Sequence, residues 1–247
     1  MALKIALLGY GKMGHEIESA ATQAGHSVVA KFDVNNPATL AELKQSAAQV
    51  AIDFSQANAV EANVKLCASA GVPIVIGTTG WDNAREAVRK IVEESGIGCV
   101  IGSNFSIGVN LFLEIVRTAS QLMNAADYDA YILEAHHRAK KDFPSGTALR
   151  IGEAMLAELK SKTKIISELP QGSAIPEDVL LVSSIRSGAI TGIHTVGFES
   201  AEDSIELTHR AKSRRGFAVG AVRAAEWIVG RKGFYRFEEK IRDILEL

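Results

Sequence analysis

The chain has 247 residues, of which 47% are hydrophobic and 23% charged, and its formal net charge is −2. This composition is typical of a globular protein large enough for one big domain or two small ones. The nearly balanced charge argues against a nucleic-acid or membrane-surface binder. No apolar run approaches the ~20 residues of a membrane span, and the first residues resemble a strand rather than a signal peptide. We therefore expect a cytoplasmic protein.

The two cysteines, Cys67 and Cys99, both lie in apolar runs. Cysteines in such runs are more often buried thiols than disulfide partners, so we expect free thiols in a reducing compartment. The Cys and His residues do not have the spacing of metal ligands, and we expect no metal site.

The N-terminal segment contains a glycine-rich turn between a strand and a helix. We expect the strand over 3–8, the helix over 15–24 and a second strand over 27–32. The turn reads Gly9-Tyr10-Gly11-Lys12-Met13-Gly14. In this context the first glycine permits the tight turn, the second lets the backbone approach a pyrophosphate, and the third lets helix and strand pack closely. The helix start then faces the phosphates, so we predict a dinucleotide site; the alternative is a tight turn without a ligand.

Asp33, at the end of the second strand, bears on the choice of cofactor. A carboxylate at this position accepts hydrogen bonds from a ribose 2′-hydroxyl and repels a 2′-phosphate. The residues that follow it include no arginine, and Lys12 is the nearest cation in the sequence pattern. We therefore predict that NADH is used at least as well as NADPH, with Lys12 able to support NADPH binding.

Strands and helices continue to alternate through the first hundred residues. The patterns predict strands over 50–54, 72–76 and 97–101, with helices over 58–70 and 81–95 between them. This alternation predicts an α/β fold with a Rossmann-like, doubly wound parallel sheet. In such sheets ligands bind beyond the carboxyl ends of the strands.

Two loops at those strand ends are candidate cofactor contacts. The first contains Gly77, Thr78 and Thr79, and the second contains Gly102, Ser103, Asn104 and Phe105. Hydroxyl groups and open backbone in the first loop suit a ribose or the nicotinamide amide, and Asn104-Phe105 would border the nicotinamide. The alternatives are a flexible loop without a ligand for the first segment and hinge packing for Phe105.

After residue 106 the pattern changes to long helices and consecutive strands. We expect helices over 109–124, 147–160 and 217–229, and strands over 129–134, 180–186, 189–198 and 203–209. Strands that follow one another without helices predict an α+β domain with a mixed or antiparallel sheet, whose exposed face would suit subunit contact. The last helix should pack back on the first domain. The predicted domains are 1–106 with 216–247 for the dinucleotide, and 107–215 for substrate binding and oligomerisation.

The run from Glu134 to Ala148 concentrates groups that bind and protonate an anion. It reads Glu-Ala-His-His-Arg-Ala-Lys-Lys-Asp-Phe-Pro-Ser-Gly-Thr-Ala. His136 titrates near neutrality and Lys140 carries an ammonium, so either group is a candidate proton donor. The Pro-Ser-Gly-Thr turn at 144–147 opens a helix, whose first N–H groups can bind a carboxylate. Such a site suits a small substrate with several carboxylates that must also receive a proton.

This run resembles the signature of one family, 4-hydroxy-tetrahydrodipicolinate reductase, the dihydrodipicolinate reductase of lysine and diaminopimelate biosynthesis. The pattern Glu-x-His-His-x-x-Lys-x-Asp-x-Pro-Ser-Gly-Thr-Ala is complete in 134–148. Segments within 77–80, 104–110 and 209–218 are similar to further segments of the family. The resemblance therefore extends over nearly the whole chain.

The chain departs from the family pattern in three places. Leu8 stands where many members have the earliest glycine of the turn, and Phe143 replaces a residue that is usually small. The segment between Asp33 and Val50 is shorter than in the longer members. These departures concern cofactor preference and loop shape rather than the reaction.

The resemblance implies NADH- or NADPH-dependent reduction of a cyclic, dicarboxylated imine or enamine, 4-hydroxy-tetrahydrodipicolinate, to tetrahydrodipicolinate. Hydride would pass from C4 of the nicotinamide to a ring carbon, and a proton would complete the reduction. The matching positions make His136 and Lys140 the proton-transfer groups. The matching substrate-binding positions are His137, Ser145, Gly146 and Thr147. Members are commonly tetrameric, so the predicted partners are the dicarboxylate substrate and the other copies of a homotetramer, without nucleic acid or membrane.

Other interpretations of these residues are possible. A single histidine beside a strand is more often structural, Lys140 can be a solvated surface charge, and Arg138 can pair with Glu134 or Asp142. His194 lies in a strand and could reach the site, although a structural role is favoured. The competing functions are another two-domain nicotinamide-dependent reductase of a small oxo acid and an NAD(H)-sensing regulator without turnover.

Overall fold

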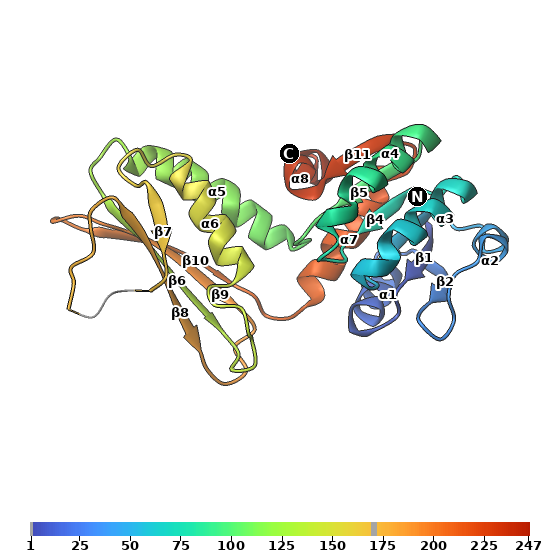
Figure 1. Ribbon diagram of the computed structural model, residues 1–247, viewed down its shortest axis with the longest axis horizontal. Helices are drawn as coiled ribbons and strands as arrows, with labels where there is room; N and C mark the ends of the chain where they lie inside the picture. Colours follow the sequence, from blue (N-terminus) through green and yellow to red (C-terminus); the bar gives the residue numbers. More distant parts are fainter. Residues whose placement is uncertain (1, 169–171) are drawn as a thin grey trace. The chain divides into compact units, whose positions relative to one another are not determined.

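The computed structural model describes residues 2–168 and 172–247. The chain divides into two compact units, drawn in Figure 1. Unit 1 consists of Met1–Asn110 and Arg214–Leu247, and unit 2 of Leu111–Ser213. The chain thus crosses between the units twice, and each crossing lies a few residues from the domain boundary that the sequence predicts.

Unit 1 is built on a six-stranded sheet in which every pair of neighbouring strands is parallel. The strand order is β11-β5-β4-β3-β1-β2. The strands are β1 (Lys4–Leu8), β2 (Ser27–Phe32), β3 (Val50–Asp53), β4 (Ile74–Ile76), β5 (Gly98–Ile101) and β11 (Gly233–Arg236). The predicted doubly wound parallel sheet is confirmed, with β11 as an additional edge strand.

Helices cover both faces of this sheet. They are α1 (Lys12–Gln23), α2 (Leu40–Gln45), α3 (Val60–Ala70), α4 (Arg85–Ser95), α7 (Arg215–Ile228) and α8 (Phe237–Leu245). Because successive strand residues point to opposite faces, Ile5 and Leu7 join one hydrophobic core with α1, α7 and α8, whereas Ala6 and Leu8 join a second core with α3 and α4. The late helix α7 therefore belongs to unit 1, as the sequence predicts.

Several elements of unit 1 differ from the sequence-based expectation. Helix α1 begins at Lys12 rather than at residue 15, because the second half of the glycine turn already forms its first turn. Helix α2, strand β11 and helix α8 were not expected. Helix α8 carries a recognisable signal, since Phe237, Ile241 and Ile244 fall on one face at helical spacing and are all buried.

Unit 2 contains a five-stranded mixed sheet with the order β10-β9-β6-β8-β7. Its strands are β6 (Asp129–His136), β7 (Lys164–Ile166), β8 (Val179–Arg186), β9 (Ile193–Glu199) and β10 (Ser204–Arg210). Strand β8 runs parallel to β6 and β7, whereas β9 runs antiparallel to β6 and β10. The expectation of a mixed sheet is confirmed, although the short strand β7 was not expected and β9 begins four residues later than predicted.

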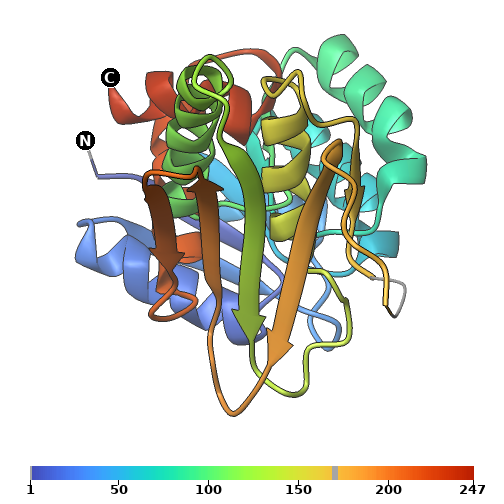
Figure 2. The ribbon, with the colours of Figure 1, turned by 90° about the vertical axis from the view of Figure 1, so that its left-hand side faces the viewer.

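Two helices lie on the same face of this sheet, α5 (Ile107–Met123), whose first turn belongs to unit 1, and α6 (Gly146–Leu156). In Figure 2 the strands stand in front of both helices, so within residues 2–168 and 172–247 the opposite face of the sheet carries no helix. Ile132 points toward α6, where a Cβ on Gly152 would lie 3.6 Å from its side chain. The neighbouring Leu133 points to the open face, as expected from the pleat.

Both cysteines are buried free thiols, as the sequence predicts. Burial raises the pKa of Cys67, on α3, and of Cys99, on β5, so neither thiol ionises readily. Within the described residues, no helix is both long and apolar enough to cross a membrane.

The packing of α7 on the loop after β5 yields a test of the fold. A Cβ on Gly220 would lie 1.8 Å from the backbone oxygen of Phe105, a contact that only backbone movement relieves. We expect Gly220→Ala to lower the free energy of unfolding by about 1–3 kcal/mol. Gly216→Ala, in the same helix, is the matched control because its Cβ would meet only the Ser106 hydroxyl at 3.6 Å. Urea denaturation of both variants checks this, and equal stabilities would contradict the packing described.

Candidate active site

The glycine turn of unit 1 has the geometry that a dinucleotide site requires. Gly9 has a φ of +98°, and a Cβ there would lie 2.3 Å from the Phe54 oxygen. A Cβ on Gly14 would lie 2.7 Å from the Gly9 oxygen, whereas one on Gly11 would meet nothing within 4 Å. The first and third glycines thus permit close packing, and the second leaves an open approach at the start of α1. The residues present fit a bound pyrophosphate at this helix start.

Asp33 follows β2 and shapes the turn after it. Its Oδ1 accepts hydrogen bonds from the N–H groups of Asn35 (2.8 Å) and Asn36 (3.0 Å). One carboxylate oxygen is therefore engaged by the backbone, and the other remains for a ribose hydroxyl. Lys12, the cation that the sequence suggested for a 2′-phosphate, is exposed in the first turn of α1.

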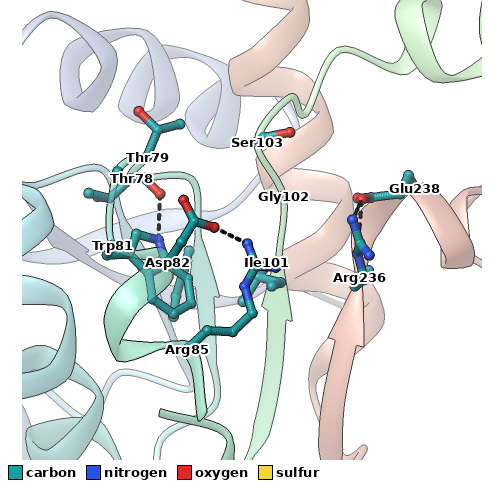
Figure 3. Close-up of a pocket in the computed structure, with 12 residues that line it drawn as sticks. Thr78, Thr79, Trp81, Asp82, Arg85, Ile101, Gly102, Ser103, Arg236 and Glu238 are labelled. Carbon is teal, nitrogen blue, oxygen red and sulfur yellow. Dashed lines mark hydrogen bonds and ion pairs between the residues drawn. The ribbon is translucent and has the colours of Figure 1, made fainter. Parts of the chain in front are cut away.

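The loops after β4 and β5 border a pocket of about 100 Å³, shown in Figure 3. Thr78, Thr79, Gly102 and Ser103 all line it. Arg85, paired with Asp82, and Arg236, paired with Glu238, line the same pocket. The two predicted cofactor loops thus lie next to each other at the carboxyl edge of the sheet, as the sequence predicts.

Phe105 packs in the hydrophobic core, which agrees with the hinge-packing alternative that the sequence left open, and its contact with the nicotinamide stays a prediction. Its side chain is only 1% exposed and lies between the rings of Phe54 and Phe237, with ring centroids 6.1 and 4.6 Å away. Core packing therefore accounts for the side chain. Its neighbour Asn104 is also buried, and its Oδ1 accepts the N–H of Ser106 at 2.8 Å.

In unit 2, the carboxylate of Glu134 is the centre of a buried cluster. Glu134 is 0% exposed, and its two oxygens accept a bidentate pair of hydrogen bonds from Arg186, at 2.7 and 3.0 Å. The same carboxylate contacts Nδ1 of His136 at 2.5 Å and accepts the N–H of Ser145 at 3.1 Å. Burial alone would raise the pKa of Glu134, but these hydrogen bonds, that from Arg186 above all, lower it to about 2. Glu134 is therefore ionised at neutral pH.

The ionised carboxylate fixes the orientation of His136, the last residue of β6. Because Glu134 can only accept, Nδ1 of His136 carries the proton and donates it to Glu134. Nε2 then points toward Gly192, where a Cβ would lie 3.1 Å away. Burial lowers the pKa of His136, and the nearby cations Lys140 and Arg186 act in the same direction, while Glu134 opposes them. Nε2 is consequently an unprotonated acceptor at neutral pH.

His194, on β9, lies beside His136, with ring centroids 5.2 Å apart. Its Nε2 is 3.2 Å from Oγ of Ser145. Burial, reinforced by the neighbouring His136, lowers the pKa of His194 to about 4, so it stays neutral. The sequence favoured a structural role for His194 but allowed it to reach the site, and the structure places it within the cluster.

The loop after β6 brings the predicted ammonium of Lys140 to Asp142, with Nζ 2.8 Å from Oδ1. This hydrogen bond lowers the pKa of the Asp142 carboxyl. Arg138 was the residue that the sequence suggested as a partner for Glu134 or Asp142; Arg186 and Lys140 take these places instead.

Helix α6 begins at Gly146, and Ser145 is its N-cap. The Ser145 hydroxyl accepts the N–H of Ala148 at 3.2 Å, and the residue is only 2% exposed. Both polar groups of Ser145 are thus engaged within the fold, and its contact with the substrate stays a prediction. A Cβ on Gly146 would meet nothing within 4 Å, so there is space beside the helix start, where a backbone hydrogen bond from Gly146 also lowers the pKa of Asp142. Thr147 follows in the same turn, half-buried like His137.

The structure thus brings His136, Ser145 and the start of α6 together around Glu134, and it adds two residues that sequence reasoning did not select, Arg186 and His194. The parallel pairing of β6 with β8 sets His136 opposite Arg186, and the antiparallel pairing with β9 sets Glu134 opposite His194. Arg186 could have been selected from the sequence, because it is a charged residue at the end of the strand predicted over 180–186. The described residues hold no cluster of three or more His, Cys, Asp or Glu side chains suited to a metal ion.

Two family models together match almost the whole chain. The model described as dihydrodipicolinate reductase, N-terminus, matches residues 3–105, and the one described as dihydrodipicolinate reductase, C-terminus, matches residues 108–241. The chain belongs to the dihydrodipicolinate reductase family. The C-terminal family segment runs through unit 2 and back into unit 1, because residues from 214 onward belong to unit 1.

Two relatives in this family are similar over nearly their full length. The chain is 38% identical to a 4-hydroxy-tetrahydrodipicolinate reductase of Christiangramia forsetii, over 99% of this chain and 100% of that protein. It is 37% identical to one of Archaeoglobus fulgidus, over 96% of this chain and 99% of that protein. The solved structure of a dipicolinate-bound dihydrodipicolinate reductase from Paenisporosarcina sp. TG-14 matches the fold with a TM-score of 0.77 at 23% identity, covering 97% of this chain and 99% of that one.

The depressed pKa of Glu134 yields a prediction about stability and pH. Because the folded state holds this pKa at about 2, below its ordinary 4.5, the ionised carboxylate stabilises the fold above pH ~4.5, and this contribution is lost as the pH falls toward 2. A shift of this size corresponds to about 3 kcal/mol. The stability advantage of the wild type over Glu134→Gln should therefore be largest above pH 5 and shrink below pH 4. Urea denaturation across this range measures it, and a difference that does not vary with pH would contradict the assignment.

Proposed function

We propose that this protein is an NAD(P)H-dependent oxidoreductase that reduces 4-hydroxy-tetrahydrodipicolinate to tetrahydrodipicolinate in lysine and diaminopimelate biosynthesis. Family membership over the whole chain gives the reaction class. The observation that carries the proposal is the His136 imidazole, whose Nδ1 is held by the ionised Glu134 while Nε2 faces Gly192. Bound NADH or NADPH supplies the hydride, a proton completes the reduction, and the 4-hydroxyl group of the substrate leaves as water.

The dinucleotide is assigned to unit 1. The cofactor-binding residues are those of the turn 9–14, Asp33, the loop 77–79 and the loop 102–105. The open approach over Gly11 supports a pyrophosphate at the start of α1, and the free oxygen of Asp33 supports a ribose hydroxyl. Within the second loop, the buried Phe105 contributes its backbone and its packing rather than its ring.

The substrate carboxylates are assigned to His137, Lys140 and the start of α6 at Gly146 and Thr147, with Ser145 holding that helix start in place. The open space at Gly146 and the positive end of the helix suit one carboxylate. Lys140 is paired with Asp142 in this structure, so a substrate carboxylate must compete with Asp142 for the ammonium.

Proton transfer is assigned to His136 and Lys140. A neutral His136 accepts a proton at Nε2, and a doubly negative substrate nearby favours the protonated imidazole, which opposes the effects of burial and of the neighbouring cations. Glu134 then stabilises the imidazolium while keeping its ring orientation unchanged. Lys140 is the second proton source, once its ammonium is released from Asp142.

The reaction itself is tested by the loss of nicotinamide absorbance at 340 nm when the pathway imine is generated in the cuvette. The proposed function predicts consumption of NADH or NADPH that depends on both the imine and the protein. Binding of NADH without imine-dependent turnover would instead support a nucleotide sensor. Turnover with other oxo acids but not with this imine would support a different reductase.

His136→Gln should lower kcat by about a hundredfold or more, the usual size of a general acid–base contribution, while the Kd for NADH stays unchanged. Thr147→Ala is the comparison variant and should mainly raise the KM for the imine, because it alters the carboxylate site and not the proton-transfer group. Steady-state kinetics and a fluorescence titration of NADH provide the three constants. A kcat for His136→Gln within about threefold of the wild type would remove His136 from the proton step.

Cofactor preference is predicted from Asp33. Its carboxylate favours a ribose hydroxyl over a 2′-phosphate, so NADH should be used at least as well as NADPH, and Asp33→Asn should improve NADPH relative to NADH. The measurement is KM for each cofactor at saturating imine. A wild-type KM for NADPH about tenfold below that for NADH would contradict the prediction.

We further propose that the protein is a cytoplasmic homotetramer and that the open face of the unit 2 sheet makes a subunit contact. Leu133 and Ile185 are apolar residues on this face and are 36% and 47% exposed. Apolar side chains gathered on a sheet face without helices favour contact with another copy. Light scattering should give a tetramer for the wild type and smaller species for Leu133→Lys combined with Ile185→Lys. A wild-type monomer would refute the proposed assembly.

A further inference from the structure

A second buried carboxylate, Asp53, lies at the carboxyl end of β3 in unit 1 and is 0% exposed. Its Oδ1 accepts hydrogen bonds from the Ser55 N–H (3.0 Å), the Ser55 hydroxyl (2.8 Å) and the Thr78 hydroxyl (2.6 Å). Its Oδ2 accepts Nδ2 of Asn63 at 2.7 Å. We propose that Asp53 is a positioning residue for the dinucleotide, which acts by fixing the loops after β3 and β4.

The chemistry of this network favours a specific role. All four donors are neutral groups, so hydrogen bonds alone offset the cost of burying the charge. If the side chain at this position only filled space, an apolar residue would do so without the desolvation cost of a buried carboxylate. A carboxylate, in contrast, accepts at both oxygens and therefore imposes one orientation on every donor around it.

The donors belong to segments that form the cofactor edge. Thr78 lies in the loop after β4, and its hydroxyl accepts the Ser55 N–H at 2.8 Å while donating to Asp53. Asp53, Ser55 and Thr78 thus form a closed set of hydrogen bonds between two neighbouring loops. The proton of the Thr78 hydroxyl is committed to Asp53, so this carboxylate sets the orientation of the threonine.

The intervening residue, Phe54, carries the effect to the glycine-containing segments. Its backbone oxygen would lie 2.3 Å from a Cβ on Gly9, and its ring would lie 2.1 Å from a Cβ on Gly77. Both glycines therefore pack directly on the segment that Asp53 holds. A shift of Phe54 and Ser55 would displace the glycine turn and the loop after β4 together.

This inference rests on the proposed function, because it takes the dinucleotide to bind at the edge where these loops meet. The test is the Kd for NADH, titrated by fluorescence well below the melting temperature of each variant. Asp53→Asn should raise this Kd by about tenfold to a hundredfold, the size expected when a hydrogen-bond network to a charged group is broken. Its new amide would face Nδ2 of Asn63, donor against donor.

The rescue variant is Asp53→Asn with Asn63→Asp, which exchanges the two side chains and restores a donor–acceptor pair. It should recover most of the lost affinity. Thr78→Val removes the hydroxyl, and adding Asp53→Asn to Thr78→Val should weaken NADH binding little further, because both changes break the same connection. If Asp53→Asn fails to fold, the rescue variant and Thr78→Val still measure the effect.

The matched control is His26→Gln. His26 is also buried in unit 1 and bridges the Leu3 N–H and Glu226, at 3.1 and 2.8 Å, in a network separate from the glycine turn. The His26→Gln variant should have a lower melting temperature than the wild type and the same Kd for NADH. An Asp53→Asn variant that binds NADH within about twofold of the wild type would overturn the proposal. So would a double variant whose loss of NADH affinity equals the sum of the losses in Asp53→Asn and Thr78→Val. Failure of the wild type to bind NADH would refute the proposed function instead.

Discussion

The hydrogen bonds to the buried carboxylate of Glu134 are the constraint on which the rest of unit 2 depends. They join strand β6 to strand β8 through Arg186 and to the start of helix α6 through Ser145. Arg186 also donates to the Asp142 oxygen at 2.7 Å, which ties down the loop that carries Lys140. Removing either Glu134 or Arg186 would leave the other as a buried charge without a counter-charge, which is strongly destabilising. The fold therefore depends on keeping both residues. The hydrogen bonds around Glu134 thus fix the position of the His136 ring and the nitrogen, Nδ1, that carries its proton.

Each unit of the chain thus has one buried carboxylate at the edge where its ligand is expected. In unit 2 the charge of Glu134 is balanced by Arg186, and the cluster directs a titrating imidazole. In unit 1 the charge of Asp53 is met by neutral donors, and the network directs backbone and hydroxyl groups. The difference suits the two tasks: proton transfer needs a group whose charge can change, whereas dinucleotide binding needs loops that do not move.

Much of the fold followed from local sequence patterns. The glycine turn was predictable with the role of each glycine, because strand, turn and helix adjoin in the chain. The residues missed at the site come from further away: Arg186 and His194 lie 52 and 60 residues after Glu134, and only the pairing of β8 and β9 with β6 brings them to it. Sequence spacing does not encode that register. For Phe105 the sequence left two roles open, nicotinamide contact and hinge packing, because a loop residue can face either a ligand or the core; its ring fills the core beneath the loop.

Without substrate, the ionised Glu134 holds the proton of His136 on Nδ1, while burial and the neighbouring cations Lys140 and Arg186 keep the ring neutral. Nitrogen-15 NMR of the histidine rings, in uniformly labelled protein with His136→Gln to assign the signal, tests it most directly. At pH 7.5 we expect an unprotonated Nε2 and a protonated, hydrogen-bonded Nδ1, and we expect the tautomer to change in Glu134→Gln. A proton on Nε2 in the wild type, or a ring that is fully protonated at this pH without substrate, would contradict it.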